Sequence, residues 1–193
     1  MYTTLEKIRA QSPCADGWTQ LLAHLGKTKA DSTPLSLSVI LESNGLDDTL
    51  WCFQAVDGFE REKRLYVVWC ARQAQHLLTD PRSLTAPDVA EKFANDLASL
   101  EELAAARDAA MGAAWDTQAA RASGWADSEA TAYTDCAAWV AAATTTNARA
   151  GWVVARATRA ATRNATRASQ IQELKRVLAC TEAGIDPYPP KEK

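Results

Sequence analysis

The sequence is poor in the residues on which most recognisable active sites depend. Its 193 residues include only 8 glycines and 2 histidines, His24 and His76. No glycine-rich phosphate loop, dinucleotide-binding fingerprint or G-x-S-x-G nucleophile motif occurs. On one predicted helix, His76 would lie about 120° around the axis and about 9 Å along it from Cys70, too far for a thiol–imidazole dyad. We therefore expect a protein that is not an enzyme and that needs no cofactor.

Cysteine is also too sparse and too scattered to build a metal site or a disulfide framework. Five cysteines occur, none in a C-x-x-C pair. Structural zinc sites require paired ligands at short spacing. We therefore expect no metal, and free thiols that behave as small buried hydrophobes. The cysteines are Cys14, Cys52, Cys70, Cys136 and Cys180.

Long hydrophobic runs are missing as well. No apolar stretch reaches the roughly 18 residues that a membrane span requires. The first residues, 1–6, carry neither the basic nor the apolar segment of a secretory signal. These absences lead us to expect a cytoplasmic protein with no membrane partner.

Capping and stop signals divide residues 1–98 into about six short helices. Thr3 and Glu6 have capping-box spacing, and Ser12-Pro13 and Ser32-Thr33-Pro34 each pair an N-cap residue with a following proline. Gly26 and Asn44-Gly45 suit helix ends. The alternation over 35–39 is also typical of a strand, but we favour a helix there because helical caps flank it and no partner strand is visible.

The rest of this first part follows the same pattern. Asp47 is expected to cap a helix that reaches Val56, and a longer helix is expected over 59–78. Residues 65–70 are apolar almost all round, which indicates a buried central helix. Asp80-Pro81 and Ala86-Pro87 together are expected to mark a turn and to start a short helix through Val89, Phe93 and Leu97.

From Ser99 onward the composition changes. The chain has 39 alanines, of which 26 lie between Ala104 and Ala168, and large tryptophans recur among them. Alanine favours helices that approach each other closely, so we expect long helices near 100–122, 125–143 and 147–181. The fold class is therefore all-α: a helical bundle of short N-terminal helices followed by long Ala-rich antiparallel helices. We divide the chain into a short-helix bundle (1–98), an Ala-rich long-helix region (99–183) and a flexible tail (184–193), and leave open whether the two halves pack as one unit.

The strongest surface signal is a row of arginines on the last predicted helix. At 100° per residue they fall within an arc of roughly 80°, opposite a face of alanines. Residues 1–147 carry 12 basic and 20 acidic side chains, a net charge of −8, whereas residues 148–193 carry 9 basic and 4 acidic ones, a net charge of +5. We call these five residues the arginine ridge: Arg149, Arg156, Arg159, Arg163 and Arg167.

Two interpretations of the arginine ridge remain open. In the first, the arginines pair with acidic neighbours of their own bundle or are simply solvated. In the second, they form a docking edge for an acidic partner. The isoelectric point of about 5.5 argues against direct nucleic-acid binding.

Other candidate site residues lie in the first part of the chain. Three tryptophans there are typical of a hydrophobic core, with a ligand pocket as the alternative: Trp18, Trp51 and Trp69. The spacing of the acidic residues does not predict that they meet in a carboxylate cluster, although four of them could: Asp47, Asp48, Glu60 and Glu62. We assign Asp47 and Asp48 to the first turn of a helix.

Four stretches of the chain together resemble a known group of proteins. The resemblance is to Ala-rich helical proteins of temperate phages and prophages of Gram-negative bacteria, which have no assigned function or are labelled immunity proteins. It implies a genomic setting and no catalytic residue. The stretches are 21–28, 40–52, 68–73 and 80–83.

This setting implies a protein that binds and disables a component of the bacterial host cell. We expect a non-enzymatic protein-binding factor, an inhibitor of a bacterial defence complex of the anti-CRISPR kind. Its partner would be a bacterial protein or ribonucleoprotein with an acidic surface, contacted by the arginine ridge. The alternatives are an immunity protein that neutralises a toxin, a self-assembling helical homo-oligomer, and an enzyme in which His24 or His76 meets carboxylates or a thiol.

Overall fold

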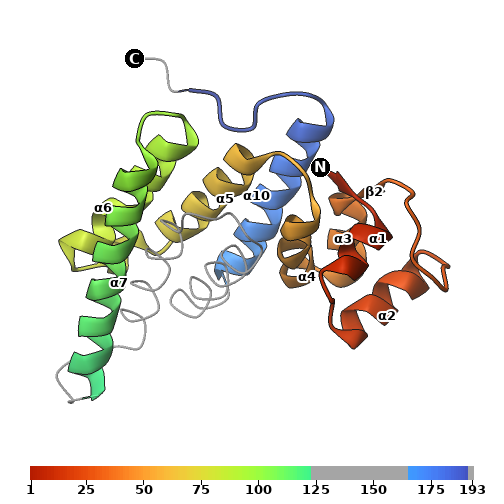
Figure 1. The fold of residues 1–193 in the computed structure, drawn as a ribbon, viewed down its shortest axis with the longest axis horizontal. Helices are drawn as coiled ribbons and strands as arrows, with labels where there is room; N and C mark the ends of the chain where they lie inside the picture. Colours follow the sequence, from red (N-terminus) through yellow and green to blue (C-terminus); the bar gives the residue numbers. More distant parts are fainter. Residues whose placement is uncertain (123–164, 191–193) are drawn as a thin grey trace.

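The computed structural model describes residues 1–122 and 165–190, and within them nearly all of the regular secondary structure is helical (Figure 1). This confirms the all-α class. None of the helices in these two ranges is long and apolar enough to cross a membrane. The α-helices are α1 (Leu5–Ala10), α2 (Ala15–His24), α3 (Leu37–Asn44), α4 (Leu46–Trp51), α5 (Glu60–Arg72), α6 (Pro81–Ala94), α7 (Leu100–Ala122) and α10 (Ala165–Glu182). Two 3₁₀ turns, η1 (Cys52–Ala55) and η2 (Gln75–Leu77), and two strands, β1 (Tyr2–Thr3) and β2 (Leu35–Ser36), complete the described elements.

Several helix ends lie where the local signals predict them. At the start of α7, Ser99 Oγ accepts from the Glu102 N–H (3.2 Å) and Glu102 Oε2 accepts from the Ser99 N–H (2.7 Å), a complete capping box. Gly26 follows the end of α2 with φ 63°. There the Lys27 N–H reaches back to the Leu22 carbonyl (2.9 Å) in a Schellman motif. Asp80 caps α6, with Pro81 in its first turn.

Other predicted starts are wrong because contacts distant in sequence prevail over local capping. The proline after Ser32-Thr33 begins no helix; instead Leu35 and Ser36 form β2, which pairs antiparallel with β1 in the register Tyr2 to Ser36. The Leu37 N–H donates to the Met1 carbonyl (3.1 Å), so the partner of β2 is the chain's first residues. The strand that we considered and rejected over 35–39 is therefore present, but only over Leu35 and Ser36.

The remaining corrections concern the positions of caps and ends. Thr4, not Thr3, caps α1, because Thr3 lies in β1 and its hydroxyl donates to the buried Ala55 carbonyl. Helix α2 begins after Cys14 rather than at Pro13, and Ser12 has φ 56°. Helix α4 is preceded by Gly45 rather than capped by Asp47, and its helical path ends in η1.

Helix α5 is shorter than predicted and α6 is longer. Helix α5 ends at Arg72, and the predicted extension to residue 78 contains η2 instead. Helix α6 continues through Pro87, which starts no separate helix. Proline removes one helical hydrogen bond, but Ala86 and Ala90 on either side are fully buried against neighbouring elements, and this packing keeps the helix continuous.

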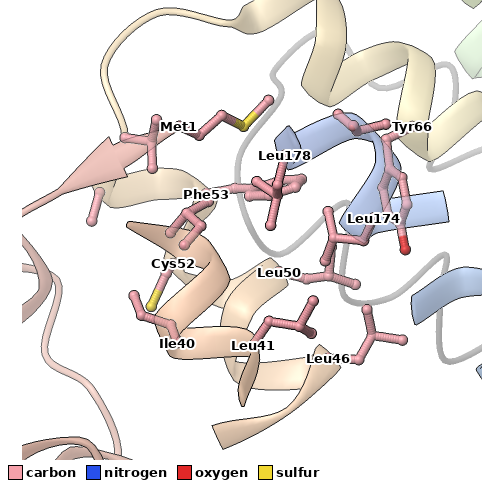
Figure 2. Close-up of a cluster of buried hydrophobic side chains, with 14 of the residues drawn as sticks. Met1, Ile40, Leu41, Leu46, Leu50, Cys52, Phe53, Tyr66, Leu174 and Leu178 are labelled. Carbon is pink, nitrogen blue, oxygen red and sulfur yellow. The ribbon is translucent and has the colours of Figure 1, made fainter. Parts of the chain in front are cut away.

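The larger of two hydrophobic clusters joins the first helices to the last one. Figure 2 shows Leu174 and Leu178 of α10 among side chains of α3, α4 and α5. Leu174, Val177 and Leu178 are fully buried there. The Tyr66 hydroxyl donates to the Gln170 carbonyl (3.1 Å), which adds a buried polar link between α5 and α10. The end of the Ala-rich half thus completes the core of the N-terminal bundle.

The second cluster lies on the other side of α5, where α6 and α7 pack against each other and α6 packs against α5 (Figure 1). Val68 of α5, Ala90 of α6 and Leu103 of α7 belong to it. Because α5 contributes to both clusters, its near-continuous apolar sequence is explained, and the predicted central helix is confirmed. Both clusters draw residues from either side of position 98/99, so that boundary is one of composition rather than of packing.

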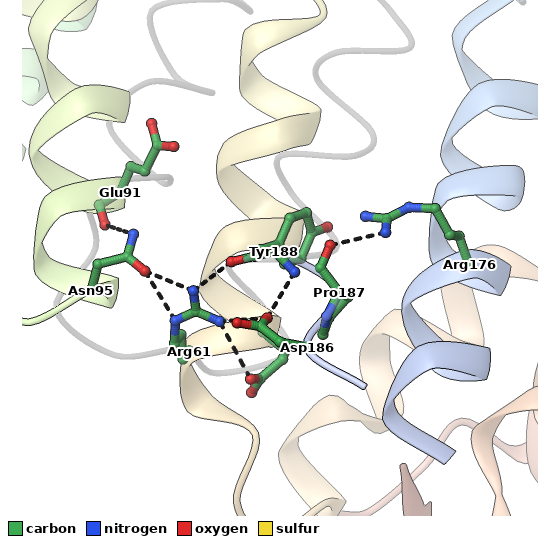
Figure 3. A network of polar contacts seen from close by, with 8 residues as sticks. Arg61, Glu91, Asn95, Arg176, Asp186, Pro187 and Tyr188 are labelled. Carbon is green, nitrogen blue, oxygen red and sulfur yellow. Dashed lines mark hydrogen bonds and ion pairs between the residues drawn. The ribbon is translucent and has the colours of Figure 1, made fainter. Parts of the chain in front are cut away.

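The expected flexible tail is held against the body over its described part (Figure 3). Arg61 donates to Asp186 Oδ1 (2.8 Å), to the Tyr188 carbonyl (2.6 Å) and to Asn95 Oδ1 (2.8 Å). The Tyr188 hydroxyl donates to Glu173 Oε1 (2.9 Å). These contacts tie residues 186–188 to α5 and α10, and Arg61 also binds Asn95 after the end of α6; the proline-rich composition of the tail did not reveal them.

Candidate functional site

A cavity of about 250 Å³ lies between α2 and the corner where α3 meets α4. Its walls are largely apolar, with carboxylate and amide groups among them. Trp18 and Trp51 line it and also pack against the larger core, while Trp69 stacks on Tyr66 (centroids 6.3 Å apart). All three tryptophans therefore pack against the core, as we favoured, and two of them also line a cavity. The lining residues are Pro13, Cys14, Gly17, Trp18, Leu21, Ile40, Asn44, Asp47, Asp48, Trp51 and Cys52.

Asp48 is fixed in this cavity by a close approach of two helices. Asn44 Nδ2 donates both to Asp48 Oδ2 (2.8 Å) and to the Gly17 carbonyl (2.8 Å). A Cβ at Gly17 would lie 2.6 Å from Asp48 Oδ2, so only glycine allows the carboxylate to approach α2 this closely. Gly17, Asn44 and Asp48 thus form one unit that sets the position of a half-buried carboxylate.

The two thiols of the cavity differ in their surroundings. Cys52 is buried, and burial together with the charge of Asp48 raises the pKa of its thiol to about 12. It therefore stays protonated at neutral pH and is a poor nucleophile. Cys14 is exposed at the start of α2.

The arginine ridge lies outside the described residues except at its last member. Arg149, Arg156, Arg159 and Arg163 fall between the two described ranges. Arg167, on α10, is 51% exposed, and its Nη1 lies 3.5 Å from Oδ2 of Asp47 at the cavity. At this position the ridge contacts an acidic side chain of its own bundle, as one of the two interpretations expected.

The histidines and the suggested carboxylate cluster are not brought together. His24 and His76 are exposed, on α2 and η2, and neither is among the described residues that line the cavity. Glu60 Oε1 pairs with Lys63 (3.0 Å) and Glu62 lies beside Arg61, away from Asp47 and Asp48. Within residues 1–122 and 165–190, no group of three or more histidine, cysteine or acidic side chains is arranged to hold a metal ion.

Large apolar side chains are exposed at two places on the α6–α7 pair. Leu97 and Leu100 lie at the connection between the two helices, and Trp115 is 69% exposed further along α7. Next to Trp115, Asp116 pairs with Arg82 of α6 (2.7 Å), which fixes α7 against its neighbour. Nothing in the sequence distinguished Trp115 from the other tryptophans of the Ala-rich half, because each recurs as a large side chain in an alanine-rich stretch.

Comparison of the chain with protein-family models, with curated proteins and with solved structures finds no match. The resemblance to phage and prophage proteins therefore remains an expectation from the sequence.

Proposed function

We propose that this protein is a non-enzymatic binding factor of phage or prophage origin that inhibits a bacterial defence complex. Its contact surface would include the arginine ridge, and its target would be a bacterial protein or ribonucleoprotein with an acidic surface. The phage setting and the class of target come from the sequence resemblance; the binding surface comes from the charge distribution.

The observation that carries the proposal is the separation of charge along the chain. A net charge of +5 over residues 148–193 stands against −8 over the preceding 147 residues, and the spacing of five of the basic residues predicts that they share one helical face. Such a basic strip attracts an acidic surface and orients it during association. Nucleic acid alone is a weaker partner, because the acidic remainder of the chain repels phosphates.

Two features of the described residues support a role in protein binding. Arg167 keeps half of its side chain exposed while it contacts Asp47, so its guanidinium can engage a second carboxylate. The exposed indole of Trp115 is of the residue type that contributes most binding energy in protein interfaces. Helix α7 holds this indole on a rigid support.

The test is capture of host proteins by the tagged chain and by a charge-reversed variant of the ridge. The variant carries Arg156→Glu, Arg159→Glu and Arg163→Glu. The matched control carries Lys29→Glu, Lys92→Glu and Lys175→Glu, three exposed lysines outside the ridge, and has the same net charge. The proposal predicts a partner that the wild type and the lysine control retain and the ridge variant loses.

The functional consequence is measured in cells that carry an active defence system. Expression of the wild-type chain is expected to restore plaque formation by a targeted phage, and expression of the ridge variant is not. Equal partner recovery by all three proteins would refute the ridge as the contact surface. Rescue of cells from a co-expressed toxin, with no effect on defence, would favour an immunity protein instead.

A further inference from the structure

We propose that the cavity between α2 and α4 binds a small organic cation, a guanidinium or ammonium group on a short apolar stem. Arg167 of the arginine ridge reaches Asp47 at the edge of this cavity, but ligand binding there does not depend on the function proposed for the ridge. Trp18 and Trp51 supply aromatic walls, and Asp48 supplies the charge that selects the ligand.

The size and lining of the cavity define the class of ligand. About 250 Å³ is far more than the roughly 30 Å³ of one water molecule. It is slightly below the roughly 300–1,000 Å³ of sites for drug-sized ligands. A group of several heavy atoms fits, and the apolar contribution of Leu21 and Ile40 favours a stem of methylene groups over a fully hydrated ion.

Asp48 carries a charge that the described part of the protein does not neutralise. Its carboxylate accepts a hydrogen bond from Asn44, and no basic side chain within residues 1–122 and 165–190 pairs with it. A half-buried carboxylate gains most from a partner that is charged and donates hydrogen bonds. An anion would be repelled, and a neutral ligand would leave the carboxylate uncompensated.

Other residues of the same cavity already hold guanidinium groups. The guanidinium of Arg9 lies over the Trp18 ring, 5.5 Å from its centroid. Arg167 approaches Asp47 at 3.5 Å. Both the aromatic and the acidic components of the cavity are thus suited to a planar cation.

The experiment compares binding of n-butylguanidinium and n-butylurea, which share size and stem but differ in charge. Isothermal titration calorimetry measures affinity, and the indole N–H signals of Trp18 and Trp51 in proton–nitrogen NMR spectra locate the bound probe. We expect saturable binding of the cation, shifts of both indoles, and at least about tenfold weaker binding of the urea, because the neutral urea forms no charge-assisted hydrogen bond with the Asp48 carboxylate.

Two variants and one control test the role of Asp48. Asp48→Asn keeps the shape and removes the charge, and Gly17→Ala places a Cβ where it displaces the carboxylate. Both are expected to weaken n-butylguanidinium binding by about tenfold or more. Asp16→Asn, an exposed carboxylate on α2 outside the cavity lining, is expected to leave affinity unchanged. Circular dichroism spectra confirm that each variant is folded.

The same titration distinguishes the two sources of such a cation. A capped tripeptide with a central arginine that binds more tightly than n-butylguanidinium identifies the ligand as a side chain of another protein. Weaker binding of the peptide identifies a free small molecule. No saturable binding at millimolar concentration, equal affinity for the urea, or unchanged affinity of Asp48→Asn would overturn the proposal. The urea comparison uses only the wild-type protein and so stands even if a variant fails to fold.

Discussion

Replacement of Leu174 by alanine tests whether α10 completes the core of the N-terminal helices. The side chain is fully buried between α10 and the bundle of α3, α4 and α5. Leucine-to-alanine changes at such sites cost the transfer free energy of the lost methyl groups plus the free energy of the cavity left behind. Surrounding helices limit collapse into that space, so we expect a loss of about 3–4 kcal/mol in the free energy of unfolding. For a chain of this size that corresponds to a fall of roughly 6–16 °C in Tm.

The assay is urea unfolding followed by far-ultraviolet circular dichroism, with Leu97→Ala as the matched control. Leu97 is 74% exposed, so the same substitution there is expected to change the free energy of unfolding by less than about 0.5 kcal/mol. If Leu174→Ala is no more destabilising than Leu97→Ala, the C-terminal helix does not belong to the first core and the described packing is wrong.

Two further predictions concern ionisable groups. Hydrogen bonding from Arg82 lowers the pKa of Asp80, so the stabilisation from this pair is present above the ordinary carboxyl value of 3.8 and is lost as the pH falls through the lowered pKa. Asp80→Asn, which keeps the capping oxygen, should therefore be less stable than wild type at pH 7, and urea titrations should show this difference shrinking as the pH falls below 3.8. A difference independent of pH would contradict this. Because Cys52 is buried and its pKa is about 12, iodoacetamide at pH 8 should alkylate exposed Cys14 in the native protein and modify Cys52 only after unfolding, as read from peptide masses. Equal rates at the two thiols would show that the Cys52 thiol is neither buried nor held protonated in the native protein.

Local signals predicted the helices whose ends are determined by neighbouring residues. The side chains of Ser99 and Glu102 accept hydrogen bonds from each other's backbone N–H groups, and Gly26 adopts a positive φ that other residues avoid. The start of α7 and the end of α2 are therefore each determined by a few consecutive residues. The central position of α5 was also predictable, because residues 65–70 leave it no polar face.

Errors occurred where a partner distant in sequence decides the local conformation. Ser36 lies in a strand because Tyr2 pairs with it, although prolines and caps nearby suggested a helix. Pro87 remains inside α6 because its neighbours are buried against other helices. Tyr188 is held to the body by Arg61 and Glu173, which lie 127 and 15 positions away in the sequence. None of these pairings has a signature within a short window of sequence.

From the sequence, a pocket lined by tryptophans was predictable only as the alternative to a purely structural role in the core. Trp18 and Trp51 were recognised as core or pocket residues, but their convergence with Asp48 depends on how α2 meets α4, which Gly17 and Asn44 control. Asp47 and Asp48 were correctly placed in the first turn of a helix. Nothing in their spacing indicated that Asp48 would line a cavity with two tryptophans and would pair with no basic side chain among residues 1–122 and 165–190.

The most direct test of the proposed contact surface is the reactivity of the arginine ridge in the native protein. Phenylglyoxal modification, quantified arginine by arginine from peptide masses, compares each ridge residue with Arg61, whose guanidinium is held by hydrogen bonds to the body. The account predicts that Arg156, Arg159 and Arg163 react as fast in the folded chain as in urea, while Arg61 reacts more slowly. If the three ridge arginines are as protected as Arg61, they pair within their own bundle, and the proposed recognition surface is contradicted.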